Sequence, residues 1–216
     1  MALPINAPIP ADRRAQAEAL AALDPGGLKR LFPLLDGMHP VSEDDVELIL
    51  NNTWRPTLSV TGAGGLPEPA AAGNVLRTDT ALTLSLRTPP LADAKAAGAA
   101  LVQALTTDVP YGATVEISDF VAENGWNAPA LAPWLSAAMD SISDRVFGQE
   151  YGSLGIGGSI PFMEMLARRY PAAQIVITGA LGADSNAHVP DEWLDIAFAQ
   201  QITQAVAHLL DAHARS

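Results

Sequence analysis

The sequence predicts an α/β protein, and three observations lead to this fold class. The segments 57–61, 81–87 and 114–118 alternate apolar and polar residues, as half-buried strands do. A fourth segment, 174–178, is almost entirely apolar, which is typical of a strand covered on both faces. Stretches rich in alanine and leucine separate these segments and favour helices.

Residues 1–53 are predicted to form a helical connector. An alanine-rich helix is expected over 12–23, and the sequence Asp-Pro-Gly-Gly at 24–27 ends it. A second helix is expected to begin at Ser42, which can act as its N-cap because Asp45 follows three residues later.

Residues 54–124 form the next predicted module. Its alternating segments at 57–61, 81–87 and 114–118 predict a three-stranded antiparallel sheet. The helix expected over 91–105 would pack on one face of that sheet. Such an arrangement of strands and helix is an α+β module.

Residues 125–216 combine helices with the apolar strand. A helix is predicted over 133–147, and a glycine-rich loop, a helix, the strand 174–178 and a final helix follow. Residues spaced three to four apart predict one core-facing side of the final helix; they are Leu194, Phe198, Ile202, Val206 and Leu209.

The composition limits the classes of partner. The formal net charge of −12 repels phosphate backbones and anionic lipids, so we expect neither nucleic acid nor membrane binding. The absence of cysteine excludes disulfides, thiolate zinc sites and cysteine nucleophiles, and it fits a reducing cytoplasm. The first residues lack the basic and apolar regions of a signal peptide.

Three segments carry candidate chemistry, each with a simpler alternative. The glycine-rich loop at 155–162 could present backbone amides and the Ser159 hydroxyl to an anion, or it could be a capped turn without a ligand. His188, in a polar loop after the strand 174–178, could bind a metal, or it could cap the next helix or face solvent. Arg87, at the end of a strand, could clamp a carboxylate or be an exposed structural arginine.

Five ordered motifs together resemble the co-catalytic zinc peptidase family. This family includes carnosinase-like dipeptidases, glutamate carboxypeptidase, acetylornithine deacetylase and succinyl-diaminopimelate desuccinylase. The resemblance extends over roughly 51–210. The motifs are Trp-Arg-Pro-Thr-Leu at 54–58, Gly-Asn-Val-Leu at 73–76, Ser-Leu-Arg-Thr-Pro-Pro at 85–90, Gly-Gly-Ser-Ile-Pro-Phe at 157–162 and Asn-Ala-His at 186–188.

The resemblance implies a role for each of these positions. His188 would be the last ligand of a site for two zinc ions. Gly158 and Ser159 would bind substrate beside a helix N-terminus, Arg87 would bind the substrate's terminal carboxylate, and Asn74 would contact substrate from a lid. The implied substrate is a dipeptide or small N-acyl amino acid, and the implied assembly is a homodimer.

The resemblance also implies a division of the chain and a limit on its activity. Residues 54–124 would be an incomplete lid and dimerisation domain, and 125–216 the C-terminal segment of a catalytic domain. No segment before Trp54 resembles the family's other metal ligands or its Glu-Glu pair, and Val189 stands where a glycine is usual. We therefore expect the chain alone to be inactive, because one histidine cannot hold two zinc ions. The alternative is a non-catalytic module for dimerisation or small-molecule binding.

Overall fold

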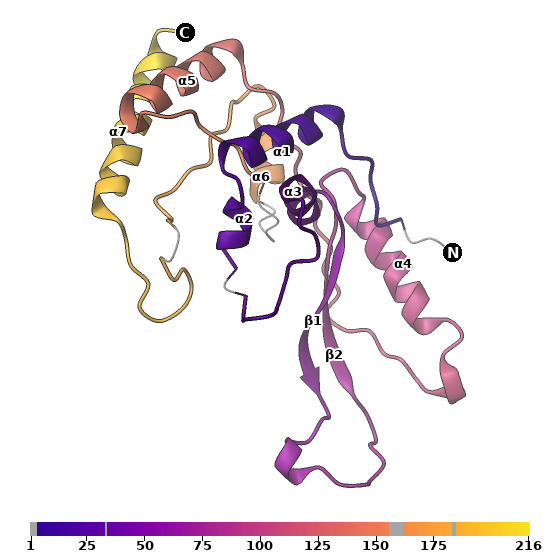
Figure 1. Ribbon diagram of the computed structural model, residues 1–216. Coiled ribbons are helices and arrows are strands. Elements are labelled where there is room, and N and C mark those ends of the chain that lie inside the picture. The colour runs from indigo at the N-terminus through magenta and orange to yellow at the C-terminus, as the bar shows by residue number, and fades with distance from the viewer. Residues whose placement is uncertain (1–3, 33, 156–161, 183–184) are drawn as a thin grey trace. The chain divides into compact units, whose positions relative to one another are not determined.

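A computed structural model describes residues 4–32, 34–155, 162–182 and 185–216 (Figure 1). The chain divides into two compact units, which we describe separately. Among the described residues, the first unit contains 4–8, 53–126 and 162–164, and the second contains 9–32, 34–52, 127–155, 165–182 and 185–216. Helices and strands are both present, so the predicted α/β class is confirmed.

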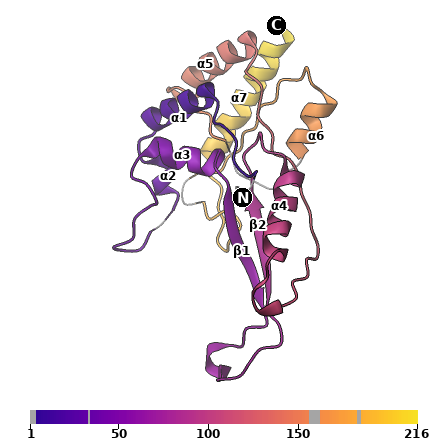
Figure 2. The same cartoon turned by 90° about the vertical axis from the view of Figure 1, so that its right-hand side faces the viewer.

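A long antiparallel hairpin dominates the first unit. Strand β1 (Thr57–Gly64) pairs with β2 (Ala81–Arg87), so that Thr57 lies opposite Arg87 and Gly64 opposite Ala81. Thr61 is an extra residue in β1, since the register shifts between Val60 and Gly62. Such a bulge increases the local twist of the pair. Both views show the hairpin as an extended ribbon (Figures 1 and 2).

The prediction of a third strand at 114–118 is wrong. This segment is irregular, and the sheet described by the structure has two strands. The 3-10 turn Pro110–Gly112 precedes it, with Tyr111 in the left-handed region at φ 60°. Val115 and Ile117 remain 39% and 42% exposed. Alternation of apolar and polar residues shows only which side chains could share one face. A strand forms only if a neighbouring strand also offers free backbone groups with which to pair.

Helix α4 (Ala94–Thr106) and the turn before it form the small core of the first unit. Asp93 caps the helix by accepting from the Ala96 N–H at 3.0 Å, so the helix begins three residues later than expected. The Asn124 side chain accepts from the Ala94 N–H at 3.0 Å, and a Cβ on Gly125 would lie 2.8 Å from Pro90 Cα. The segment at 124–125 therefore packs closely against the start of α4. Buried residues here are Trp54, Pro89, Ala92, Ala94 and Ala97.

Helices build the second unit. They are α1 (Ala11–Leu23), α2 (Gly27–Arg30), α3 (Asp45–Thr53, whose last residue belongs to the first unit), α5 (Pro133–Phe147), α6 (Phe162–Arg169, whose first residues belong to the first unit) and α7 (Ile196–Ala214). The predicted helices at 12–23 and 133–147 are confirmed. Within the described residues, no helix is both long and apolar enough to cross a bilayer.

Helices α5 and α7 pack against each other in antiparallel directions. Phe147, at the end of α5, lies against Phe198 near the start of α7, with ring centroids 6.0 Å apart. At the other end, Trp134 meets His213 edge to face at 5.2 Å. Gln201 donates to the Val146 carbonyl at 3.1 Å. These pairs align the two helices over most of their length.

The prediction of a strand at 174–178 is also wrong. The segment is irregular and Ile177 is 62% exposed. Its first residue, Gln174, is held by the Ala132 N–H, which donates to Gln174 Oε1 at 2.7 Å. A strand of this apolar kind forms between neighbouring strands, and the described part of the second unit contains none.

The final helix differs from its prediction at its start. Asp195 caps α7 by accepting from the Phe198 N–H at 3.0 Å, so Leu194 lies outside the helix and is 57% exposed. None of the described α7 residues is fully buried. The expected core face is therefore only half covered, by α5. The buried residues of the unit are Ala17, Leu48, Ile49, Leu50, Leu135 and Ile142.

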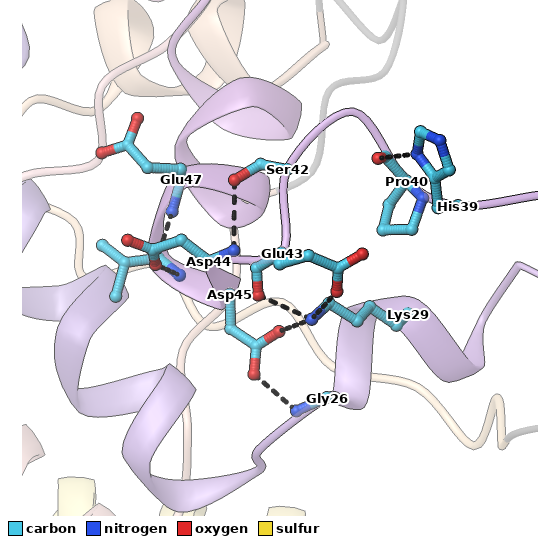
Figure 3. A network of polar contacts seen from close by, with 10 residues as sticks. Gly26, Lys29, His39, Pro40, Ser42, Glu43, Asp44, Asp45 and Glu47 are labelled. Carbon is cyan, nitrogen blue, oxygen red and sulfur yellow. Dashed lines mark hydrogen bonds and ion pairs between the residues drawn. The ribbon is translucent and has the colours of Figure 1, made fainter.

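The predicted cap of α3 must be corrected as well. Asp44 caps this helix, because its Oδ1 accepts from the Val46 N–H at 2.9 Å. Ser42 instead accepts from the Asp44 N–H at 3.1 Å, one turn before the helix begins (Figure 3). A carboxylate satisfies free amides at a helix start and also interacts favourably with the helix dipole.

A network of charges ties α2 to the start of α3 (Figure 3). Lys29 Nζ lies 3.2 Å from Asp45 Oδ1 and donates to the Glu43 carbonyl at 2.7 Å. Asp45 Oδ2 accepts from the Gly26 N–H at 2.7 Å. The Gly26 N–H, followed by Lys29, holds the pKa of Asp45 below its ordinary value. The bond to Asp45 in turn raises the pKa of Lys29.

We expect this network to make folding sensitive to acid. Because the folded-state pKa of Asp45 is lowered, its stabilising contribution is present above the unfolded pKa, about 4, and is lost as the pH falls through the folded value. Asp45→Asn should therefore lower the melting temperature near neutral pH and flatten its fall between pH 6 and 3. Thermal unfolding followed by circular dichroism measures both effects.

The matched control is Asp36→Asn, which changes an exposed acid in the loop that precedes α3. It should follow the wild-type curve. If the melting temperatures of the wild type and of Asp45→Asn fall in parallel down to pH 3, Asp45 is not the source of the acid sensitivity.

Candidate functional site

His188 lies in a tight loop that precedes α7. Within this loop the Trp193 N–H donates to the Ser185 carbonyl at 3.1 Å, and the Val189 N–H donates to the Asn186 carbonyl at 3.2 Å. Ser185 is buried, and its hydroxyl donates to the Gly182 carbonyl at 2.8 Å. The loop is thus closed on itself by backbone and hydroxyl bonds.

Backbone strain marks the position of His188. Its φ is 67°, and Asn186 and Asp191 have φ values of 55° and 63°, so three non-glycine residues within six adopt the left-handed region. This region costs an ordinary residue roughly 1–2 kcal/mol, and strain of this kind concentrates at functional sites. The imidazole itself is exposed to solvent. The loop therefore presents His188 outward from a fixed turn.

Arg87 and Asn74 belong to the first unit and lie far apart in it. Arg87 is the last residue of β2 and is exposed. Asn74 lies in the loop beyond the opposite end of β2 and is also exposed; there the Val75 N–H donates to the Gly73 carbonyl at 2.8 Å. A seven-residue strand spans about 20 Å at roughly 3.4 Å per residue. The hairpin does not bring these two predicted substrate contacts together.

The predicted contacts Gly158 and Ser159 lie outside the described residues. His188 belongs to the second unit, whereas Arg87 and Asn74 belong to the first. The first unit therefore holds Arg87 and Asn74, which the hairpin keeps apart, and His188 belongs to the second unit.

The described residues do not fit a two-zinc centre. Nowhere among them do three histidine, aspartate, glutamate or cysteine side chains gather as metal ligands. Zinc needs three or four protein ligands, and His188 offers one. The acidic side chains that follow it, Asp191 and Glu192, are exposed on the same loop.

A shallow depression beside the His188 loop was not predicted from the sequence. Its volume is about 440 Å³, and apolar side chains form most of its wall. Leu181, Trp193 and Leu194 remain 65%, 49% and 57% exposed there. The lining residues are Ala180, Leu181, Glu192, Trp193 and Leu194. Large apolar residues on both sides of the polar histidine segment were the available sequence signal.

One curated relative shares sequence with most of this chain. No family model matches the chain. A cysteinylglycine-S-conjugate dipeptidase of Corynebacterium striatum is 24% identical over 178 residues, which are 82% of this chain and 39% of that protein. The chain thus spans about two fifths of the length of this relative.

Solved structures of peptidases share the fold. Human carnosine dipeptidase 1 has a TM-score of 0.74 at 16% identity, and the match covers 97% of this chain and 44% of that one. An M20 family metallo-carboxypeptidase of Sulfolobus solfataricus has a TM-score of 0.73 at 19% identity, with coverages of 95% and 46%. The di-peptidase Dug1p of Saccharomyces cerevisiae has 0.63 at 17%, with coverages of 98% and 44%. The relative and these neighbours are dipeptidases and carboxypeptidases, as the five motifs predict.

Proposed function

We propose that this chain is the substrate-binding portion of a metal-dependent dipeptidase or carboxypeptidase. One observation carries the proposal: at least 95% of the chain matches less than half of each of three solved peptidases. The shared fold and the ordered motifs support the same reading from independent directions. In this interpretation 1–53 is a helical connector that precedes the lid, 54–124 forms the lid, and 125–216 belongs to the catalytic domain.

The proposed substrate is a dipeptide or another small amide with a free terminal carboxylate. Arg87 binds that carboxylate, because a guanidinium can donate two parallel hydrogen bonds to it. Ser159 and Gly158 contact the substrate beside it, and Asn74 contacts it from the lid. His188 provides one ligand to zinc from its strained loop.

The chain is proposed to be inactive by itself. His188 is its single proposed ligand, and nowhere do the described residues bring three potential metal ligands together. Without a complete ligand set, neither the metal nor a bound water is held in place. We further propose a cytoplasmic homodimer as the assembled form, following the family that the motifs resemble.

Two matched samples test this proposal. The first is the isolated chain with zinc, cobalt or manganese, for which we expect no hydrolysis of a dipeptide panel. The second is a chimera in which the chain replaces the 178 matching residues of the Corynebacterium striatum dipeptidase. For the chimera we expect hydrolysis that a chelator abolishes.

Two results would overturn the proposal. Metal-dependent turnover by the isolated chain, lost on His188→Ala, would show that it needs no further ligands. A folded chimera that binds dipeptides without hydrolysing them would favour a non-catalytic binding module instead. Circular dichroism and thermal unfolding establish that the chimera is folded.

A further inference from the structure

Helix α1 lies beside several passages of the chain from one unit to the other. Among its passages between the units, the chain crosses from Pro8 to Ile9, from Asn52 to Thr53, from Trp126 to Asn127 and, within α6, from Glu164 to Met165. Helix α1 begins at Ala11, directly after the first passage. Its first two turns then contact Glu47, in the helix that ends at the passage at 52–53, and residues 127–128, directly after the passage at 126–127. All the contacts described below lie within the second unit.

Arg13 holds the chain immediately after the passage at 126–127. Its Nε donates to Asn127 Oδ1 at 3.1 Å, and its Nη2 donates to the Ala128 carbonyl. Its remaining nitrogen, Nη1, donates to Gln16 Oε1 at 3.0 Å. All three nitrogens therefore have acceptors, and the side chain is only 18% exposed. A planar guanidinium fixes such paired acceptors better than an ammonium can.

Arg14, the next residue, holds the helix that leads into the passage at 52–53. Its Nη1 lies 3.2 Å from Glu47 Oε1 on α3, and α3 ends at Thr53. The buried residues Leu48, Ile49 and Leu50 make this helix a rigid extension of the unit. Both views show α1 and α3 side by side (Figures 1 and 2).

Gln16 adds a third connection from the same turn of α1. Its Nε2 donates to the Ser153 carbonyl at 2.9 Å, while its Oε1 accepts from Arg13. One turn of α1 thus contacts three segments that are distant in sequence, at 47, 127–128 and 153. Arg13 bonds both the Asn127 side chain and the Ala128 carbonyl, which are more than 110 residues away, so it does more than cover the surface.

We propose that α1 is a clamp, formed by Arg13, Arg14 and Gln16, that fixes the second-unit side of two chain passages, at 52–53 and 126–127. At these two passages, a rearrangement of the units would bend the backbone at Thr53 and Trp126, on the first-unit side of the clamped residues. Arg13 is the main positioning residue because it bonds the residue directly after a passage. This proposal concerns the connection of the units and does not depend on the peptidase activity.

The chain's lack of cysteine allows a direct test. Gln103→Cys on α4 and Asp140→Cys on α5, both exposed positions, carry spin labels on the first and second units. Double electron–electron resonance then measures the distribution of distances between the labels. We expect Arg13→Ala to broaden this distribution relative to the labelled parent. Hydrogen exchange of the peptide at 127–132 should become about tenfold faster or more.

Two further variants separate the clamp from general stability. Arg13→Lys keeps the charge and the stem but cannot bond both acceptors, so it should also broaden the distribution. Arg30→Ala removes an exposed arginine that pairs with Asp24 and the Pro25 carbonyl, and it should change neither measurement. If Arg13→Lys is folded, with a distance distribution and exchange at 127–132 like those of the parent, the proposal is wrong. Equal broadening by Arg30→Ala would contradict it as well.

Discussion

Replacing His188 by alanine in the chimera with the Corynebacterium striatum dipeptidase is expected to abolish metal-dependent hydrolysis. The imidazole is proposed to complete a ligand set whose other members lie outside this chain. Loss of a residue that merely orients a ligand costs roughly 10–100-fold in metal affinity or activity, so loss of a ligand should cost at least as much. The measurements are kcat/KM for a dipeptide and the zinc bound per chain, and both should fall.

The matched control is His39→Ala, which removes another exposed loop histidine whose described contact is with the Pro40 carbonyl at 3.2 Å. This variant should keep wild-type activity and zinc content. Full activity and zinc content in His188→Ala would rule out the ligand role. Loss of activity with zinc unchanged would assign His188 to substrate binding and would equally reject it as a ligand.

The helices could be predicted closely because their signals are local. The segment predicted at 133–147 is helix α5, with Pro133 at its first position and Gly148 as a left-handed cap at its end. Proline and glycine in these places are strong boundary signals. The start of α3 was misplaced because Ser42, Asp44 and Asp45 can all cap a helix, and the geometry selects Asp44.

The strands were predicted less well because pairing is not local. The segments 57–61 and 81–87 lie in β1 and β2, which pair across the loop between them. The segments 114–118 and 174–178 are richer in β-branched residues than 81–87 but remain irregular. The sequence of each segment shows which side chains a strand would bury. It does not show whether another strand lies beside the segment to pair with it. Apolar composition alone therefore overestimated the sheet.

Part of the candidate site was visible in the sequence and part was not. The position of His188 in a polar loop was predicted, but its left-handed backbone was not, because φ above zero is favoured for glycine and gives no signal at histidine. The depression formed by Leu181 and Trp193 depends on how the loop folds back through the Trp193–Ser185 hydrogen bond. Contacts of that kind join residues without any periodic pattern.

The second large effect is expected at Arg87. In the active chimera, Arg87→Ala should weaken the preference for a dipeptide over its C-terminal amide by roughly 10–100-fold, because a desolvated charge-assisted hydrogen bond contributes about 1.5–3 kcal/mol. Arg87 is exposed at the end of β2, so the full effect requires that bound substrate exclude water from the guanidinium. Arg87→Lys should rescue only part of the preference, since an ammonium lacks the planar fork.

The ratio of Michaelis constants for a dipeptide and its C-terminal amide measures this preference directly. Arg77→Ala is the control, because Arg77 is an exposed arginine of the same unit in the loop between β1 and β2. A change of the ratio in both variants would point to the overall charge of the unit rather than to a specific contact, since each substitution removes one positive charge. A ratio that changes in Arg87→Ala alone, mainly through KM, identifies a contact made equally in the bound and transition states. An unchanged ratio in Arg87→Ala would mean that the substrate carboxylate is bound elsewhere, and the strand end would then be an ordinary exposed arginine.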